Sequence, residues 1–279
     1  MGNKYLLVKG VNGFGNMIST LNVAYQYAVK SNRTLTIDWT HPEWRLGFDR
    51  YFSLNNVKYI PYDDFLQKCV SKKLCIYPPE FSDLSKSTLD VFPDIEKTGN
   101  YSIFNKTSEL LFDKNYDVLV FSYNWLGYND IGMFWSNLVL NSVLKEYIQN
   151  KLNILGKYKG IHIRHTDNKN VTTNWAIDFV KNNLNTNIYV ATDNQKILNI
   201  IQKMHNNVYN FTRFYSVEQK PLHTLSVNDI DKHNINIDTI TDMYMLINSD
   251  ELKITPIKTI PFMTTYSLLA MSLKLANQN

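Results

Sequence analysis

The sequence predicts an α/β protein of two doubly wound domains, and two observations support this prediction. Over the first forty residues, the apolar run KYLLV is followed by a glycine-rich turn, a stretch with helical spacing and a second apolar run, RTLTIDW. A strand, loop, helix and strand in this order are typical of parallel sheets with right-handed crossovers. The alternation restarts near residue 156, where KGIHIRH and NIYVATD predict two further strands.

The remaining elements follow from apolar runs and helical spacing. DVLVFSY, residues 117–123, predicts a strand, and helical spacing extends from about residue 134 to 152. Later in the chain, QKILNIIQKMH and MYMLINS predict helices, ELKIT a short strand and PFMTTYSLLAMSLKL a closing helix. Residues 40–115 show no clear periodicity, so their elements cannot be placed. We therefore expect an N-terminal domain at residues 1–155 and a C-terminal domain at 156–279.

The composition fits a globular protein and argues against several classes of function. The 279 residues are 44% hydrophobic and 19% charged, which is enough to bury a core and argues against disorder. The net charge of +4 comes from scattered lysines, which argues against a nucleic-acid surface. Cys69 and Cys75 are too few for a disulfide scaffold or a zinc site. No apolar run reaches the roughly 18 residues that span a membrane, so we expect a soluble, cytoplasmic protein.

Charged residues gather where the strand in GIHIRHTD, residues 160–167, comes to its end. Side chains alternate along a strand, so His162 and Arg164 share one face, while His165 and Asp167 fall at or beyond the carboxyl end. Ligands of open parallel sheets bind outside these ends. Arginine suits a phosphate because it stays charged and can bind bidentately. The stretch predicts a phosphate site. The alternative is a structural ion pair between Arg164 and Asp167, with both histidines as satisfied groups of the core.

Two further stretches are candidates for the same site. In YVATDN an apolar strand runs into Asp193, although TDN can also be a simple helix cap. In ITPIKTIPFM, Thr255, Lys258 and Thr259 precede a helix whose N–H groups and positive dipole end can bind an anion. A plain capped helix would show the same pattern, so these signals gain weight only in combination with Arg164.

Two other motifs are weaker. GVNGFGN follows a strand and opens a helix, and Asp38 ends the next strand as the ribose-binding acid of a dinucleotide site would. The third glycine of that fingerprint is absent, so Gly13 and Gly15 indicate a close backbone approach or a tight turn. Asp229 and Asp231 have the acid-any-acid spacing of metal-dependent sugar transferases, a triplet that often arises by chance. NAD binding and a metal site are minor alternatives.

These stretches resemble the motifs of the fucosyltransferase superfamily of GT-B glycosyltransferases, above all the bacterial nodulation α1,6-enzymes. GFGNMISTLNVAYQYAVKSNRTLTIDW is similar to the opening strand, loop and helix of those enzymes, and GIHIRHTD to the first motif of the superfamily. YVATDN looks like the second motif and TDMYMLINSDELKIT like the third. The resemblance implies a GT-B fold, in which two Rossmann-like domains face a cleft. The N-terminal domain would bind the acceptor and the C-terminal domain GDP-fucose.

The resemblance also implies roles for particular residues. Arg164 matches the arginine that engages the donor's pyrophosphate, and His162 the histidine two positions before it. Asp193 and Asp242 match acids of the second and third motifs, and Thr259 falls near the hydroxyl residue that meets the β-phosphate. The expected donor-binding residues are His162, Arg164, Asp193, Asp242, Lys258, Thr259, Gly13 and Gly15.

The identity of the catalytic base is open. His165 stands where the commonest form of the family has a second arginine, as in the nodulation enzymes. The glutamate proposed as the base in the eukaryotic α1,6-enzymes has no counterpart, because Thr172 or Thr173 occupies its place. We expect Asp167 to be the base, with His165 as the alternative, since either could reach an acceptor hydroxyl from the end of the strand.

The implied function is an inverting, metal-independent transfer of fucose from GDP-fucose to a sugar or glycan acceptor, with no cofactor. Negative charge develops on the leaving phosphate in such a transfer, and fixed cations with a helix N-terminus can stabilise it in place of Mg²⁺. Two alternatives stay open. One is another nucleotide sugar, carrying a pentose such as xylose or a different deoxysugar; the other is a non-catalytic glycan or nucleotide binder that has lost its base.

Overall fold

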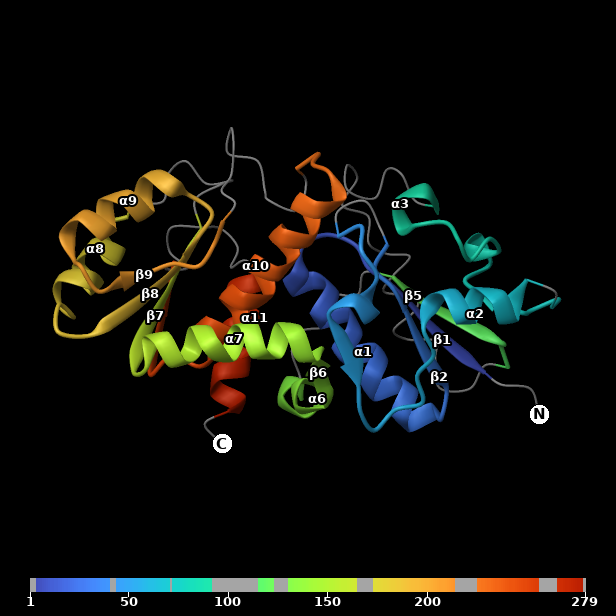
Figure 1. Cartoon of the computed structure of the whole chain (residues 1–279). Coiled ribbons are helices and arrows are strands. Elements are labelled where there is room, and N and C mark those ends of the chain that lie inside the picture. Colours follow the sequence, from blue (N-terminus) through green and yellow to red (C-terminus); the bar gives the residue numbers. More distant parts are fainter. Residues whose placement is uncertain are drawn as a thin grey trace. The chain divides into compact units, whose positions relative to one another are not determined.

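The computed structural model describes residues 4–40, 44–70, 72–91, 115–122, 130–164, 173–213, 225–255 and 265–277. The chain divides into two compact α/β units, residues 1–141 and 142–279 (Figure 1). The sequence analysis placed the boundary near residue 155. Helix α7, Ser142–Leu155, lies in the second unit by this division, whereas the sequence analysis assigned it to the first domain.

The first unit contains a four-stranded parallel sheet in the order β2–β1–β5–β4. Its strands are β1 (Tyr5–Lys9), β2 (Thr34–Asp38), β4 (Ile76–Tyr77) and β5 (Val118–Ser122). Helix α1, Phe14–Ser31, connects β1 to β2, as the alternation predicted. Every residue of the central strands β1 and β5 is buried, which explains why both strands are continuous apolar runs in the sequence.

The region after β2 contains short elements that periodicity did not reveal. They are η1 (Phe48–Arg50), β3 (Phe52–Leu54), α2 (Tyr62–Cys69), η2 (Pro79–Phe81) and α3 (Thr88–Val91). An aromatic cluster that includes residues of η1 and β3 surrounds Trp39. Its ring centroid lies 5.0 to 6.4 Å from those of Phe14, Trp44, Phe48 and Phe52. Packing between large side chains, rather than a repeating pattern, holds η1 and β3 in place.

The helix predicted from about residue 134 to 152 is wrong over its middle part. The structure has α6 (Ile131–Asn137), strand β6 (Leu138–Leu140) and then α7. Residues 138–140 leave the helix because they pair antiparallel with β3, which buries Leu138 and Leu140. Helical spacing could not reveal this strand, since a short apolar run fits either geometry.

The second unit contains another four-stranded parallel sheet, in the order β10–β7–β8–β9. Its strands are β7 (Tyr158–Ile163), β8 (Asn187–Thr192), β9 (Val208–Tyr209) and β10 (Glu251–Ile254). Its helices besides α7 are α8 (Asn174–Lys181), α9 (Gln195–Met204), α10 (Asp229–Ile247) and α11 (Thr265–Ala276). The parallel arrangement confirms the predicted α/β class. No helix among the described residues is long and apolar enough to cross a membrane.

Helix α10 begins at Asp229, well before the stretch in which the sequence indicated a helix. The Asn228 Oδ1 accepts the Asp231 N–H at 2.8 Å, and the Asn228 Nδ2 donates to the Asp231 Oδ2 at 2.9 Å. Asp229 and Asp231 lie in the first turn, where the helix dipole favours negative charge. The acid pair therefore serves to start a helix. Within the described ranges, no three His, Cys, Asp or Glu side chains group as a metal site would require.

The two faces of the second sheet are packed differently at strand β7. Ile161 and Ile163 are buried in a core cluster with residues of α8 and α9 (Figure 1). On the other face, the Tyr158 hydroxyl donates to a main-chain carbonyl of α10 at 2.6 Å. Gly160 lies so close to Ser249 that a Cβ would come within 2.8 Å of the Ser249 Oγ and 3.0 Å of its Cβ. A glycine at this position lets the end of α10 approach the strand.

We expect Gly160→Ala to destabilise the second unit. Ser249 cannot easily retreat because its Oγ donates to the Leu246 carbonyl at 2.7 Å, and overpacking of this kind typically costs about 1 to 3 kcal/mol. Urea denaturation should show the loss. Gly47→Ala is the control, since nothing lies within 4 Å of a Cβ there. Equal free energies of unfolding for the two variants would contradict the close approach.

Candidate functional site

Thr255 fixes the main chain at the carboxyl end of β7. It directly follows β10, and its main-chain N–H donates to the His162 carbonyl at 3.1 Å. Its buried Oγ1 accepts the Arg164 N–H at 3.1 Å and lies 3.3 Å from the His162 carbonyl. The sequence predicts Thr255 near an anion site, which stays a prediction. In the structure its hydroxyl extends the β7–β10 pairing and holds the backbone of Arg164.

The His162 ring lies on the face of β7 that contacts α11. Its Nδ1 is 2.8 Å from the Ser267 Oγ, and the ring centroid is 5.2 Å from that of Tyr266. Desolvation, together with the positive charge of Arg164, lowers the pKa of His162 to about 3. His162 is therefore neutral at physiological pH. It can take part in hydrogen bonds near a ligand, but it adds no positive charge.

Of His162 and Arg164, only Arg164 carries a positive charge at physiological pH. It follows the last residue of β7, is partly exposed, and is held by Thr255 through its main chain. A guanidinium stays protonated at any working pH and can form two parallel hydrogen bonds with a phosphate. A cation fixed at the carboxyl edge of a parallel sheet is well placed to bind an anion, because ligands of such sheets bind there.

Asp193 lies at the same edge of the sheet as Arg164. Ile163 of β7 pairs with Thr192 of β8, so Arg164 and Asp193 each follow one of two paired residues. Asn194 caps α9, its Oδ1 accepting two main-chain N–H groups at 3.0 and 3.1 Å. The expected cap is confirmed for Asn194, and the structure brings Asp193 and Arg164 to neighbouring strand ends.

Asp242, on α10, forms hydrogen bonds with residues of β8 and of the segment after β9. Its carboxylate accepts the hydroxyl groups of Tyr189, on β8, and of Thr212, after β9; the Thr212 Oγ1 lies 3.1 and 3.2 Å from the two oxygens. Desolvation raises the pKa of Asp242 to about 7, with a smaller contribution from Asp238. Asp242 thus fastens the segment after β9 to α10. A direct contact with a donor stays a prediction.

Sequence reasoning did not single out Arg213, which is fastened to α10 beside Thr212. Its main-chain N–H donates to the Asp238 Oδ2 at 2.7 Å and its Nε to the Asp238 Oδ1 at 2.9 Å, while its Nη1 donates to the Asn234 Oδ1 at 3.0 Å. Asp238 is buried. The spacing of the sequence carries no signal for this pair, because Arg213 follows β9 and Asp238 lies 25 residues later, on α10.

The glycine-rich turn of the first unit has an ordinary backbone at Gly13. This residue is the N-cap of α1 with φ −70°, and Gly15 is buried in the first turn. The left-handed residue of the turn is Asn12, with φ 61°, a conformation that asparagine tolerates. The close approach occurs at Gly10, where a Cβ would lie 2.7 Å from the Trp39 Cδ1. Donor binding by Gly13 and Gly15 stays a prediction.

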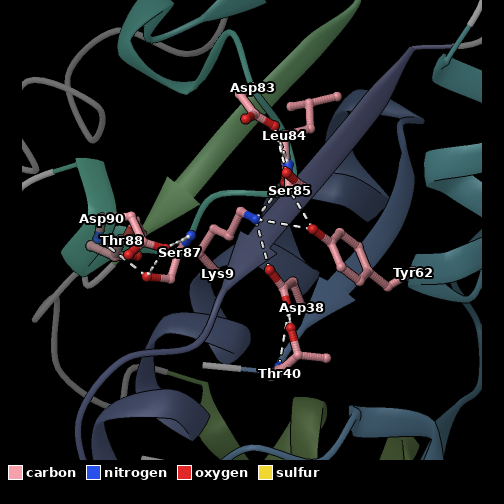
Figure 2. Close-up of polar contacts among 11 residues, drawn as sticks. Lys9, Asp38, Thr40, Tyr62, Asp83, Leu84, Ser85, Ser87, Thr88 and Asp90 are labelled. Carbon is pink, nitrogen blue, oxygen red and sulfur yellow. Dashed lines mark hydrogen bonds and ion pairs between the residues drawn. The ribbon is translucent and has the colours of Figure 1, made fainter. Parts of the chain in front are cut away.

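Asp38 is engaged in the protein interior. Its Oδ2 lies 2.7 Å from the Lys9 Nζ, and its Oδ1 accepts the Thr40 main-chain N–H at 3.0 Å (Figure 2). Asp38 is also 4% exposed. A buried carboxylate paired with a lysine is not placed to bind a ribose hydroxyl, which argues against the dinucleotide alternative.

Four of the expected site residues lie outside the described residues: His165, Asp167, Lys258 and Thr259. Of the two threonines in the place of the family's glutamate, Thr172 is also outside this part of the chain. Thr173 is the N-cap of α8, without a side-chain hydrogen bond to the helix. The structure thus brings His162, Arg164 and Asp193 to neighbouring strand ends, and places Asp242, a residue of α10, in contact with Tyr189 of β8.

The solved structures that this chain resembles include fucosyltransferases. NodZ α-1,6-fucosyltransferase co-crystallized with GDP matches with a TM-score of 0.71 at 16% identity, over 98% of this chain and 93% of that chain. Fucosyltransferase NodZ from Bradyrhizobium also matches with 0.71 and 16%, over 98% and 94%. POFUT1 in complex with GDP matches with 0.60 at 13% identity, over 97% and 94%. No family model and no curated protein matches the chain. The GT-B-type fold is confirmed.

We expect Asp242→Asn to change how stability depends on pH. In the wild type, a folded-state pKa of about 7 lies above the unfolded value of about 3.9, so the folded state holds the extra proton between these values. The stabilisation is complete below about pH 4 and is lost as the pH rises through about 7. Asparagine keeps an acceptor and stays neutral.

Relative to wild type, the Asp242→Asn free energy of unfolding should therefore rise between pH 4.5 and 8, by on the order of 2 kcal/mol. Urea titrations at several pH values measure this difference. Asp178→Asn, at an exposed carboxylate of α8, is the matched control and should show no such trend. A pH-independent difference for Asp242→Asn would show that this carboxyl is ionised in the fold across the whole range.

Proposed function

We propose that the protein is an inverting glycosyltransferase that moves fucose from GDP-fucose to a sugar or glycan acceptor without a metal ion or cofactor. The observation that carries the proposal is the position of Arg164 beside Asp193 at the carboxyl ends of two paired strands. The matched NodZ structures were obtained with GDP and after soaking with GDP-fucose, and POFUT1 with GDP. The cytoplasmic location expected from the sequence is part of the same proposal.

Arg164 has the main role in this reaction. The bond between the anomeric carbon and the β-phosphate oxygen breaks while an acceptor hydroxyl attacks from the opposite face of the sugar. Negative charge then grows on the departing GDP, and a guanidinium beside the leaving phosphate stabilises this charge more in the transition state than in the ground state. The bond from the Arg164 main-chain N–H to Thr255 fixes the point from which the side chain extends.

His162 supports Arg164 as a neutral group. A protonated imidazole two residues away would also attract the phosphate. Its positive charge, however, would have to be desolvated beside the guanidinium of Arg164. The lowered pKa removes that second charge. The same property makes His162 a poor general base, because a group with a pKa of about 3 holds a proton only weakly at neutral pH. The base therefore has to come from elsewhere.

Asp167 is the proposed base, with His165 as the alternative. Either residue follows Arg164 closely in the chain, so it would stay near the reacting phosphate. The base takes the proton of the acceptor hydroxyl as the new glycosidic bond forms. Lys258 and Thr259, which come shortly after β10, are proposed to bind the β-phosphate. Asp193 is proposed to contact the donor at the end of β8.

We expect Arg164→Ala to lower turnover of GDP-fucose by roughly 100- to 1000-fold, because removing one donor to a developing oxyanion typically costs this much. Release of GDP is the measurement, with a glycan acceptor or with water as the acceptor. Arg50→Ala is the matched control: Arg50 is an exposed arginine of the first unit, and its loss should leave turnover unchanged.

Each result separates the competing functions. Full turnover by Arg164→Ala would refute the assignment of this residue. Turnover by the wild type with another nucleotide sugar, and not with GDP-fucose, would keep the chemistry and replace the donor. Binding of GDP without turnover of any donor would favour the non-catalytic binder.

A further inference from the structure

Three neighbouring strands of the first sheet end in buried polar residues. Asp38 ends β2, Lys9 ends β1 and Ser122 ends β5, and these side chains are 4%, 1% and 2% exposed. The carboxyl edge of an open parallel sheet is the usual place for a ligand. A charged group is buried there only at a cost unless it is paired and hydrogen-bonded. The partners of Lys9 therefore indicate what this edge is built to hold.

The ammonium group of Lys9 binds three acceptors of the protein. Its Nζ lies 2.7 Å from the Asp38 Oδ2, 2.6 Å from the Leu84 carbonyl and 3.2 Å from the Tyr62 hydroxyl (Figure 2). The Tyr62 hydroxyl donates in turn to the Leu84 carbonyl at 2.8 Å. Three N–H donors thus meet three acceptors. Lys9 has no donor left for a ligand, so its role is to hold other parts of the chain.

What Lys9 holds is the segment 83–90, which we call the covering segment. Its Leu84 carbonyl is bound to the end of β1 through Lys9, and its Thr88 hydroxyl is bound to the Ser122 hydroxyl at the end of β5. Two fastenings on neighbouring strands fix this segment to the carboxyl edge of the sheet, and Figure 2 shows the one between Lys9 and Leu84. The covering segment therefore lies at the edge where ligands of open parallel sheets bind.

The exposed side chains of the covering segment suit a sugar better than a phosphate. Asp83 and Asp90 are exposed carboxylates, each of which accepts bonds from the main chain and hydroxyl of a nearby serine, Ser85 and Ser87 respectively. With Lys86 as the cation of the segment, carboxylates are in excess, and they repel a pyrophosphate. Arg164, the charged candidate for phosphate binding among the described residues, lies in the second unit. The other substrate, a neutral polyol, remains for this edge.

We propose that Lys9 is a positioning residue for the acceptor, fixing the covering segment so that this segment contacts the sugar that receives the fucose. The proposal rests on the proposed glycosyltransferase function. Acceptor binding should depend on Lys9, while donor binding and hydrolysis of the donor by water should not. A purely structural role would instead change all three together, through loss of folded protein.

The test uses variants of graded severity in the full chain. Lys9→Met alone leaves the Asp38 carboxylate buried without its partner, so the main variant combines Lys9→Met with Asp38→Asn. Tyr62→Phe is a milder change, which removes one bond to Leu84 and keeps the ring packed against Phe65 at 6.5 Å. Lys4→Met is the matched control, because Lys4 is an exposed lysine before the opposite end of β1.

In the double variant, the KM for the acceptor should rise by about tenfold or more, because a segment that is no longer fixed must be ordered when the acceptor binds. Tyr62→Phe should change this KM in the same direction by less, and Lys4→Met not at all. GDP affinity and the rate of GDP-fucose hydrolysis by water should stay at wild-type values. Amide hydrogen exchange should become faster in residues 84–91 while β1 and β2 keep their protection.

Three results would overturn the proposal. The first is an unchanged acceptor KM in variants whose covering segment exchanges faster. The second is unchanged exchange in this segment, and the third is a loss of GDP affinity that parallels the loss of acceptor binding. Failure of the proposed function is a separate result: the wild type itself would then neither hydrolyse nor transfer from GDP-fucose.

Discussion

The pairing of β10 with β7, extended by Thr255, is the interaction on which the candidate site depends. Thr255 bonds the main chain on both sides of Ile163, at His162 and at Arg164. Because these are main-chain bonds, they set the direction of the chain as it leaves the sheet without using the charged group of Arg164. Gly160 serves the same strand at another point, since it lets the end of α10 approach closely.

Each unit has a cation at the end of a strand, and the two cations differ in burial. Lys9 ends β1 and is 1% exposed, and its ammonium is saturated by a carboxylate, a hydroxyl and a carbonyl. Burial lowers the pKa of Lys9, although Asp38 opposes this effect. Arg164 follows β7, stays partly exposed and lies beside a neutral histidine. Lys9 is committed to the fold of its own unit, and Arg164 is the cation that we propose to bind the phosphates of the donor.

The elements that the sequence predicted well are those whose stability is local or whose burial is complete. The strands β1 and β5 are apolar runs whose residues are all buried, because parallel strands are covered on both faces. The start of α10 was missed because its first half is polar and its cap, Asn228, is recognised only with Asp231. Strand β6 was missed because its partner, β3, is more than 80 residues away in the chain.

The sequence predicted the position of the candidate site but not the surroundings of its residues. The strand-end rule placed Arg164 and Asp193 at one edge of a sheet from the sequence alone, and the register of β7 with β8 agrees. The neutral state of His162 was not predictable, because Ser267 and Tyr266, which come from α11, lie about a hundred residues later. The pairing of Arg213 with Asp238 likewise needs the contact between a loop and a distant helix.

The central claim is that the second unit binds GDP through its phosphates without a metal ion. The most direct measurement is the unfolding temperature in the presence of GDP, UDP, CMP or NAD, each with and without EDTA. GDP at about 100 times its Kd should add about 2.7 kcal/mol of stability. We predict that GDP alone raises the unfolding temperature, equally in both conditions. No shift with GDP, a shift with UDP or NAD instead, or a shift that EDTA abolishes would contradict the claim.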